Sequence, residues 1–259
     1  MAQHVPVTVA VLGFGEAGSA IALDLVAAGA VVRGYDPAVP APAGVTDTAD
    51  EAAAATGADL VLSVNSSKAA LDALRAGLHG CTGIWADLNT ASPALKRELA
   101  AVAAEAGVPF ADVSIMAPVP GRGLRTPLLT SGAAAAQVAE LLRPLGASVD
   151  VLEGEAGLAA ERKLLRSVFF KGWAAAVVEA LQAARAAGLE DWLRANITEE
   201  LTRADASTVD RLVEGTHQHA VRRADEMAAA TEMLRELGVT PAMAAASRDL
   251  LTRLAQRSS

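Results

Sequence analysis

Residues 7–18 read VTVAVLGFGEAG, an apolar, β-branched run followed by three glycines in the spacing GxGxxG. The run Val7–Leu12 is typical of a buried parallel strand. The glycines open a helical stretch that we expect over Glu16–Ala28 and that Gly29 ends. A strand, a glycine-rich turn and a helix in this order predict the first βαβ unit of a dinucleotide-binding sheet.

Each of the three glycines has its own physical reason. Gly13 permits the tight turn, Gly15 lets a pyrophosphate approach the backbone, and Gly18 lets helix and strand pack closely. The helix N-terminus offers unpaired N–H groups and the positive end of its dipole. A glycine-rich turn that binds nothing is the less favoured alternative, because strand, helix and Asp36 all stand where the motif requires them. The candidate cofactor residues in this turn are Gly13, Phe14, Gly15, Glu16, Ala17 and Gly18.

Asp36 ends the next expected strand, Val31–Asp36. A carboxylate at that place accepts hydrogen bonds from a ribose diol and repels a 2′-phosphate, which favours NAD over NADP as cofactor. NADP remains an alternative cofactor if the Arg33 side chain turns toward the ribose, where it would bind the 2′-phosphate. Asn65, which follows the expected strand Asp59–Val64, and Thr90 complete the candidate cofactor residues.

Strand and helix alternate over the first part of the chain. Further strands are expected at Asp59–Val64, Ile84–Leu88, Pro109–Ile115, Pro127–Thr130 and Ser148–Leu152, with helices at Pro93–Ala106 and Ala134–Leu142. This alternation predicts an α/β fold in which residues 1–152 form a doubly wound, mostly parallel Rossmann sheet.

The pattern changes near residue 153, after which we find no convincing strand. Helices are expected at Ala159–Ala187, Glu190–Arg203, Ala206–Leu237 and Pro241–Gln256. We therefore expect residues 153–259 to form an all-helical C-terminal domain.

Composition narrows the classes of function. The 259 residues carry a formal net charge of −8 and no Lys/Arg block, which argues against nucleic acid or an anionic membrane as partner. The loop Gly121–Arg125 is locally basic, and its Arg122 and Arg125 are candidate contacts to a small anionic substrate. Three features fit a cytoplasmic protein. The chain has a single cysteine, Cys81, it lacks a signal-peptide start, and it lacks an apolar span of ~20 residues.

Lys163, Ser167 and Lys171 share one face of the helix expected at Ala159–Ala187, because they lie four and eight residues apart. Arg166 lies close to that face. A lysine beside a reacting carbon can donate and accept a proton. Spacing alone favours the alternative, in which these lysines are solvated surface charges.

Three stretches resemble the 6-phosphogluconate dehydrogenase/β-hydroxyacid dehydrogenase superfamily, which also includes imine reductases. The first stretch is the glycine-rich turn at 11–18. The second, Ala86–Pro93, is similar to the family's D-x-S-T-x-x-P segment beside the nicotinamide ribose. The third, Gly157–Lys163, is similar to the family's G-x-G-x-x-x-K helix start. The resemblance implies Lys163 as general acid/base. It also implies a homodimer built by the helical domain, whose helices help to close the partner's active site.

The chain departs from that family at two places. Ser167 stands where the family has an asparagine, and Met116–Pro118 stands where β-hydroxyacid dehydrogenases have a carboxylate-binding S-G-G turn. The run Ala117–Leu129 and the segment Lys163–Gly172 resemble a subgroup whose C-terminal domain is catalogued as a domain of unknown function.

His219 and Arg223 lie four residues apart and share a helix face. His219 is a candidate for orienting the substrate, and a solvated histidine on a polar face is the alternative. We expect no metal site, because a helix puts His217 and His219 on nearly opposite sides and no carboxylate completes a ligand set.

The sequence therefore predicts an NAD-dependent oxidoreductase, with NADP possible, that moves a hydride between the nicotinamide and a small hydroxy or keto substrate. Lys163 is the predicted acid/base, with Ser167 and Lys171 beside it, and Arg122, Arg125, Arg166 and His219 are candidate substrate contacts. An imine reductase is one alternative, although those enzymes usually replace the family lysine. A dinucleotide-binding regulatory protein without turnover is the alternative from another class.

Overall fold

The computed structural model describes residues 6–257 of the chain. These residues form two compact units, of which the first ends at Arg166 and the second begins at Ser167. The division falls inside helix α6 (Leu158–Ala186), whose first turns belong to the first unit. Each unit is described by itself below.

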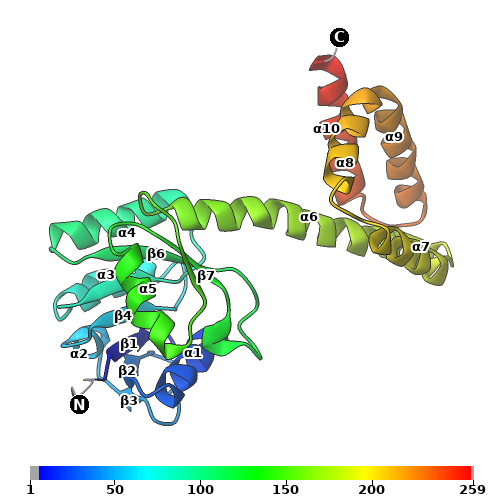
Figure 1. Ribbon diagram of the computed structural model, residues 1–259. Coiled ribbons are helices and arrows are strands. Elements are labelled where there is room, and N and C mark those ends of the chain that lie inside the picture. The colour runs from blue at the N-terminus through cyan, green and yellow to red at the C-terminus, as the bar shows by residue number, and fades with distance from the viewer. Residues whose placement is uncertain (1–5, 258–259) are drawn as a thin grey trace. The chain divides into compact units, whose positions relative to one another are not determined.

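The first unit is a sheet of eight strands with helices on both faces (Figure 1). The spatial order is β3-β2-β1-β4-β5-β6-β7-β8, and neighbouring strands run parallel except β6 and β7, which are antiparallel. This confirms the predicted Rossmann sheet. The strands are β1 (Thr8–Leu12), β2 (Val31–Tyr35), β3 (Thr46–Asp47), β4 (Leu60–Ser63), β5 (Ile84–Asp87), β6 (Phe110–Ile115), β7 (Leu128–Ser131) and β8 (Val149–Val151).

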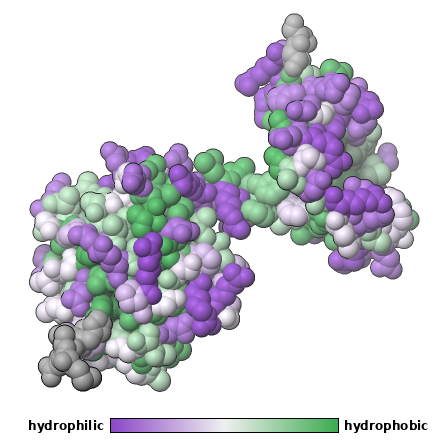
Figure 2. Space-filling view, in the orientation of Figure 1, coloured by the Kyte–Doolittle hydropathy of each residue, from purple (hydrophilic) through white to green (hydrophobic). Residues whose placement is uncertain are grey.

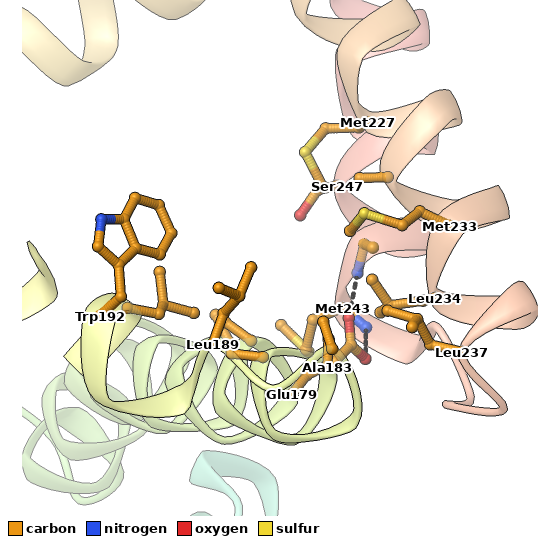
Figure 3. A pocket seen from close by; sticks show the side chains of 17 residues that line it. Glu179, Ala183, Leu189, Trp192, Met227, Met233, Leu234, Leu237, Met243 and Ser247 are labelled. Atoms are coloured by element: carbon orange, nitrogen blue, oxygen red, sulfur yellow. Dashed lines mark hydrogen bonds between the residues drawn. The ribbon is translucent and has the colours of Figure 1, made fainter.

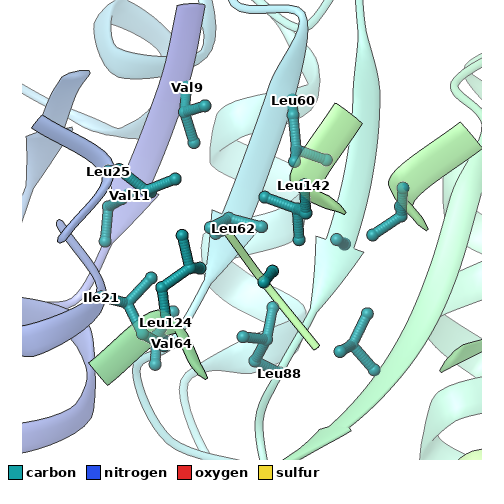
Figure 4. Close-up of a cluster of buried hydrophobic side chains, with 14 of the residues drawn as sticks. Val9, Val11, Ile21, Leu25, Leu60, Leu62, Val64, Leu88, Leu124 and Leu142 are labelled. Atoms are coloured by element: carbon teal, nitrogen blue, oxygen red, sulfur yellow. The ribbon is translucent and has the colours of Figure 1, made fainter. Parts of the chain in front are cut away.

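Alternate residues of the strands point to two apolar cores. Val9 and Val11 of β1 belong to the core under α1 and α5, which Figure 4 shows from close by. Ala10 and Leu12 belong to the core under α2, α3 and α4, where Trp85 is fully buried. The helices are α1 (Glu16–Ala27), α2 (Glu51–Ala55), α3 (Ala70–Leu78), α4 (Pro93–Glu105) and α5 (Ala135–Leu142), with short 3₁₀ turns η1 (Gly123–Arg125) and η2 (Arg143–Leu145).

Helix α4 begins where the sequence provides a cap. The Ser92 side chain accepts a hydrogen bond from the backbone N–H of Leu95, and Pro93 occupies the first turn, where its missing N–H costs nothing. Lys96, Leu99 and Ala103 lie on the buried face of this helix. The first buried residue of the helix is therefore a lysine, which lies one turn after the cap.

The second unit is entirely helical in its described part, and this too confirms the predicted fold class. The helices after α6 are α7 (Glu190–Thr202), α8 (Thr208–Gln218), α9 (Ala220–Glu236) and α10 (Ala242–Arg257). Glu179 of α6 caps α10, because its carboxylate accepts from the N–H groups of Met243 at 2.7 Å and Ala244 at 2.8 Å. Within residues 6–257, no helix is both long enough and apolar enough to cross a membrane.

The predicted single helix Ala206–Leu237 is wrong. It is two helices, because His219 leaves the helical conformation at φ −119° and ψ 26°. Gly215, Thr216 and His217 are weak helix formers and precede the break. Arg223 of α9 then donates a hydrogen bond of 2.6 Å to the Thr216 hydroxyl group, which fixes the bend.

Candidate functional site

The glycine-rich turn joins β1 to α1. Gly13 has a φ of +103°, and a Cβ on it would lie 2.8 Å from the carbonyl oxygen of Val64. A Cβ on Gly18 would collide with the carbonyl oxygen of Gly13, whereas a Cβ on Gly15 would meet no atom within 4 Å. The outer two glycines are thus required by the packing of the turn, while Gly15 faces open space in front of α1.

That open space fits a pyrophosphate. Gly15 is the residue before α1 and offers no side chain to the first turn of the helix, so the N–H groups of Glu16 and Ala17 lie at an uncapped helix N-terminus. A hollow of about 490 Å³ adjoins the turn, and its lining includes Gly13, Gly15, Asp36 and Asn65. Four of the predicted cofactor residues therefore lie around one cavity at the carboxyl edge of the sheet.

Asp36 ties the end of β2 to the glycine-rich turn. Its carboxylate accepts hydrogen bonds from the backbone N–H groups of Phe14 at 2.7 Å, Ala38 at 2.8 Å and Val39 at 3.0 Å. Burial raises the pKa of the Asp36 carboxyl group. The three hydrogen bonds together lower the pKa by more than burial raises it, so the pKa lies below its ordinary value. The group is therefore negatively charged at neutral pH.

The charges around the hollow have one sign. Glu51 of α2 and Asp72 of α3 line it together with Asp36. Arg33, which the sequence left open as a partner for a 2′-phosphate, instead donates a hydrogen bond of 2.6 Å from Nη1 to the carbonyl oxygen of Thr56. Carboxylates alone thus supply the charged lining in the part of the chain that the structure describes.

Lys163 and Thr90 meet in the first unit. The Lys163 ammonium group donates a hydrogen bond of 2.8 Å from Nζ to Thr90 Oγ1. Thr90 follows β5, and Lys163 lies in the second turn of α6. The fold thus joins the predicted acid/base to a predicted cofactor residue that lies 73 positions away in the sequence.

Asn65 is joined to the loop that carries Thr90. The side-chain nitrogen of Asn89 lies 2.7 Å from Asn65 Oδ1, 2.7 Å from Asp87 Oδ2 and 3.1 Å from Ser63 Oγ. Asn89 is buried, so these contacts replace the water that its amide would otherwise bind. The amide therefore joins the loop after β4 to the loop after β5.

The predicted arginines lie on the segment between β6 and β7 and on α6. Arg122 and Arg125 are exposed at η1, which Asp24 of α1 holds through a hydrogen bond of 2.8 Å from the backbone N–H of Leu124. Arg166 donates a hydrogen bond of 3.3 Å to the carbonyl oxygen of Met116, in the turn that departs from the family pattern. Arg166 thus contacts that turn.

Ser167, Lys171 and His219 belong to the second unit. Ser167 and Lys171 lie on α6, where Lys171 is exposed, and His219 is exposed at the junction of α8 and α9. Their roles toward a substrate stay predictions. Across residues 6–257, no group of three or more His, Cys, Asp or Glu side chains could hold a metal ion.

Sequence reasoning missed Lys96, which has no exposed surface and contacts two buried aspartates. A signal was present, because Lys96 lies three and seven residues before the apolar Leu99 and Ala103 and so shares their helix face. A lysine on the apolar face of a helix indicates a buried charge that has a partner.

Comparison with known proteins agrees with this geometry. Residues 8–152 match the family model described as the NAD binding domain of 6-phosphogluconate dehydrogenase, and residues 184–254 match the domain of unknown function DUF1932. An uncharacterized 28.5 kDa protein of Methanothermus fervidus is 24% identical over 196 residues, which make up 76% of each chain.

Solved structures show the same fold over nearly the whole chain. A conserved hypothetical protein from Sinorhizobium meliloti is 30% identical with a TM-score of 0.62, over 96% of this chain and 89% of the other. A conserved protein reported as structurally similar to 3-hydroxyacid dehydrogenases is 27% identical with a TM-score of 0.61, over 96% of both chains. An imine reductase from Streptomyces aurantiacus is 22% identical with a TM-score of 0.78, over 95% of this chain and 93% of the other.

The match at residues 8–152 covers more than half of the 259 residues and confirms the resemblance on which the predicted fold and cofactor depend. The chain therefore belongs to the family of the NAD-binding domain of 6-phosphogluconate dehydrogenase, and it is an NAD(P)-dependent oxidoreductase.

Proposed function

We propose that this oxidoreductase transfers a hydride between NAD and a small substrate with a C–OH/C=O pair, with Lys163 as the general acid/base. The observation that carries the proposal is the hydrogen bond of 2.8 Å between Lys163 Nζ and Thr90 Oγ1. It supports a lysine held beside the loop after β5, at the edge of the sheet where parallel α/β folds bind their ligands.

The bound nicotinamide would supply the hydride donor or acceptor. In the direction of reduction, the Lys163 ammonium group donates a proton to the carbonyl oxygen that becomes the hydroxyl group. In the direction of oxidation, the neutral amine takes the proton from the hydroxyl group. Thr90 accepts a hydrogen bond from the same nitrogen and so orients it.

The direct test replaces Lys163 by methionine, which keeps the length of the side chain and removes the proton. Turnover with a panel of hydroxy acids, keto acids and ketones should fall by about 10²-fold or more, the usual share of general acid–base catalysis, while NADH binding persists. Lys68→Met, at an exposed lysine of the same unit, is the control. Unimpaired turnover in Lys163→Met would remove the acid/base assignment.

The same panel should include cyclic imines. Turnover of an imine but of no carbonyl compound would favour C=N reduction. Binding of NADH without turnover of any compound would favour a regulatory protein. We rank carbonyl chemistry first because Lys163 is retained and can protonate an oxygen.

Carboxylates around the cofactor hollow support a preference for NAD. A 2′-phosphate would enter a cavity lined by Asp36, Glu51 and Asp72, and like charges in a partly buried cavity repel one another. Arg33, bound to the Thr56 carbonyl oxygen, does not line that cavity.

Exposed apolar side chains support a homodimer. Only Ala183, Leu234 and Ala244 form a buried core in the described part of the second unit, and α7 buries none of its residues. Hydrophobic surface lies over the middle of α6 (Figure 2), where Leu165, Val168, Phe169, Phe170 and Trp173 are 40–75% exposed. Soluble monomers rarely expose apolar patches of this kind.

A hollow of about 500 Å³ within the second unit adds apolar surface. Ala183, Leu234 and Met243 line it, with Leu189 and Trp192 projecting from the helical turn at one side (Figure 3). The Glu179 carboxylate at its base is already occupied by two backbone N–H groups. We propose that helices of a second copy cover this surface and α6.

A further inference from the structure

Lys96 of α4 holds two carboxylates together inside the first unit. Its Nζ lies 2.6 Å from Asp87 Oδ1 and 3.1 Å from Asp112 Oδ1, and it donates a hydrogen bond of 2.7 Å to the Asp87 carbonyl oxygen. None of the three side chains has exposed surface. Buried charges cost several kcal/mol each unless close partners compensate them, so such an arrangement needs a physical reason.

The reason begins with the sheet. Asp87 of β5 and Asp112 of β6 are direct neighbours in the register of the two strands. Like charges at neighbouring positions of a sheet repel, and the ammonium group of Lys96 between them offsets that repulsion. One ammonium group and two carboxylates leave one negative charge.

The start of α6 compensates the remaining charge. Asp112 Oδ2 accepts hydrogen bonds from the backbone N–H groups of Gly157 at 3.0 Å and Ala160 at 2.9 Å. Ser131 Oγ accepts another from the N–H of Ala159 at 3.1 Å. Side chains of β6 and β7 thus cap α6, and the positive end of the helix dipole lies against the carboxylate.

The other carboxylate, that of Asp87, is connected to the cofactor hollow through Asn89. Asp87 Oδ2 lies 2.7 Å from the amide nitrogen of Asn89, which in turn contacts Asn65 of the hollow. Thr90, the next residue, accepts the hydrogen bond from Lys163. A continuous set of polar contacts therefore joins the loop that holds the Lys163 ammonium group to the first turn of the helix that carries Lys163.

We propose that Lys96 is a positioning residue, which fixes the start of α6 relative to the loop after β5 and so sets where the Lys163 ammonium group lies. Lys96 is fully buried, so it acts through Asp87 and Asp112 and touches neither substrate nor cofactor. The inference rests on the proposed function for what Lys163 does, but the position of Lys163 can be measured without any turnover.

The measurement is the rate at which trace acetic anhydride acetylates each lysine of the NADH-bound protein, read by mass spectrometry. The chain has four lysines, Lys68, Lys96, Lys163 and Lys171, so each is resolved in its own peptide. An ammonium group held at Thr90 reacts more slowly than an exposed one. Lys68, exposed in the same unit, is the internal reference.

Two variants separate positioning from charge balance. Lys96→Met leaves two buried carboxylates without their cation and can fail to fold for that reason alone. Lys96→Met combined with Asp87→Asn restores the net charge of the cluster to that of the wild type. It also keeps Asp112 and its hydrogen bonds to α6, but the bridge between the two strands is gone. Arg75→Met on α3, at an exposed residue, is the matched control.

We expect the double variant to fold and to bind NADH. Its thermal unfolding midpoint should equal or exceed that of the single variant Lys96→Met. Acetylation of Lys163 should rise about fivefold, the change that loss of a hydrogen bond of about 1 kcal/mol produces, while that of Lys68 stays unchanged. Equal Lys163 rates in the folded double variant and the wild type would overturn the proposal and leave Lys96 as a charge-balancing residue. If Lys163→Met keeps turnover, the proposed function fails, but the acetylation result stands.

Discussion

The guanidinium group of Arg33 donates a hydrogen bond of 2.6 Å to the carbonyl oxygen of Thr56. The only cationic side chain of β2, Arg33, is therefore bound to Thr56, the residue that follows α2. Asp36, at the end of the same strand, lines the cofactor hollow together with Glu51 and Asp72. The charged side chains that line the hollow therefore all present negative charge to the cofactor.

Asp36→Ala should weaken NADH binding more than NADPH binding. The variant loses an acceptor for the ribose and removes a charge that repels a 2′-phosphate. The ratio of the two dissociation constants should shift toward NADPH by about tenfold, equivalent to ~1.4 kcal/mol. Fluorescence titration with both cofactors measures it, and Asp47→Ala at the exposed β3 is the control. An unchanged ratio would refute the preference for NAD.

Gly15→Ala and Gly18→Ala should separate binding from stability. Gly15 has a φ of −62° and open space around its Cβ direction, so alanine there should leave the unfolding midpoint nearly unchanged while blocking the pyrophosphate. Alanine at Gly18 collides with the Gly13 carbonyl oxygen, so it should also destabilise the fold, by about 1–3 kcal/mol as for other overpacked sites. Thermal unfolding with and without NADH distinguishes the two. Equal midpoints for both variants would contradict the assigned roles.

Phe169→Glu should dissociate the proposed homodimer. The side chain is 58% exposed in the single chain and contacts the rings of Phe170 and Trp173, so a charge there would be buried without a partner in a dimer. Light scattering at micromolar concentration should give a dimer for the wild type and a lower mass for the variant. Leu23→Glu, on α1, is the control with similar exposure. A monomeric wild type would disprove the proposed assembly.

Glu190 should remain ionised to low pH. Hydrogen bonds from Arg185 and then from Arg194 lower the pKa of its carboxyl group from 4.5 to about 2. A lowered pKa means that the contribution of this group to stability is fully present above pH 4.5 and is lost as the pH falls through about 2. Carbon-13 NMR titration measures the pKa directly, with the exposed Glu236 as reference. A value near 4.5 for Glu190 would contradict the contacts at the start of α7.

The parts of the fold that follow from local pattern could be predicted. The strand before the glycines, the helix after them and the long helix at Ala159–Ala187, observed as Leu158–Ala186, each combine apolar periodicity with a clear end signal. β3 and α2 were missed, since two and five residues are too short for any periodicity. α3 was missed although Ala70, Ala73, Leu74 and Gly77 have helical spacing.

The candidate site divides in the same way. The turn at Gly13–Gly18 and the acid at Asp36 are fixed by contacts within one βαβ unit, and the sequence motif records them. The contact between Thr90 and Lys163, and the cluster around Lys96, join segments far apart in the chain. A single sequence contains residue types and spacings but no long-range pairing, so the partners of Lys96 could not be found from it.

The three tryptophans give the two units separate optical reporters. Trp85 has no exposed surface in the first unit, whereas Trp173 is 40% and Trp192 63% exposed in the second. Indole fluorescence shifts to shorter wavelength and resists acrylamide when water is excluded, so in a single uncovered chain Trp85 alone should emit as a protected fluorophore. The emission of Trp85 therefore follows unfolding of the cofactor unit, and protection of Trp173 and Trp192 from acrylamide would report the proposed coverage of the helical unit by a second copy.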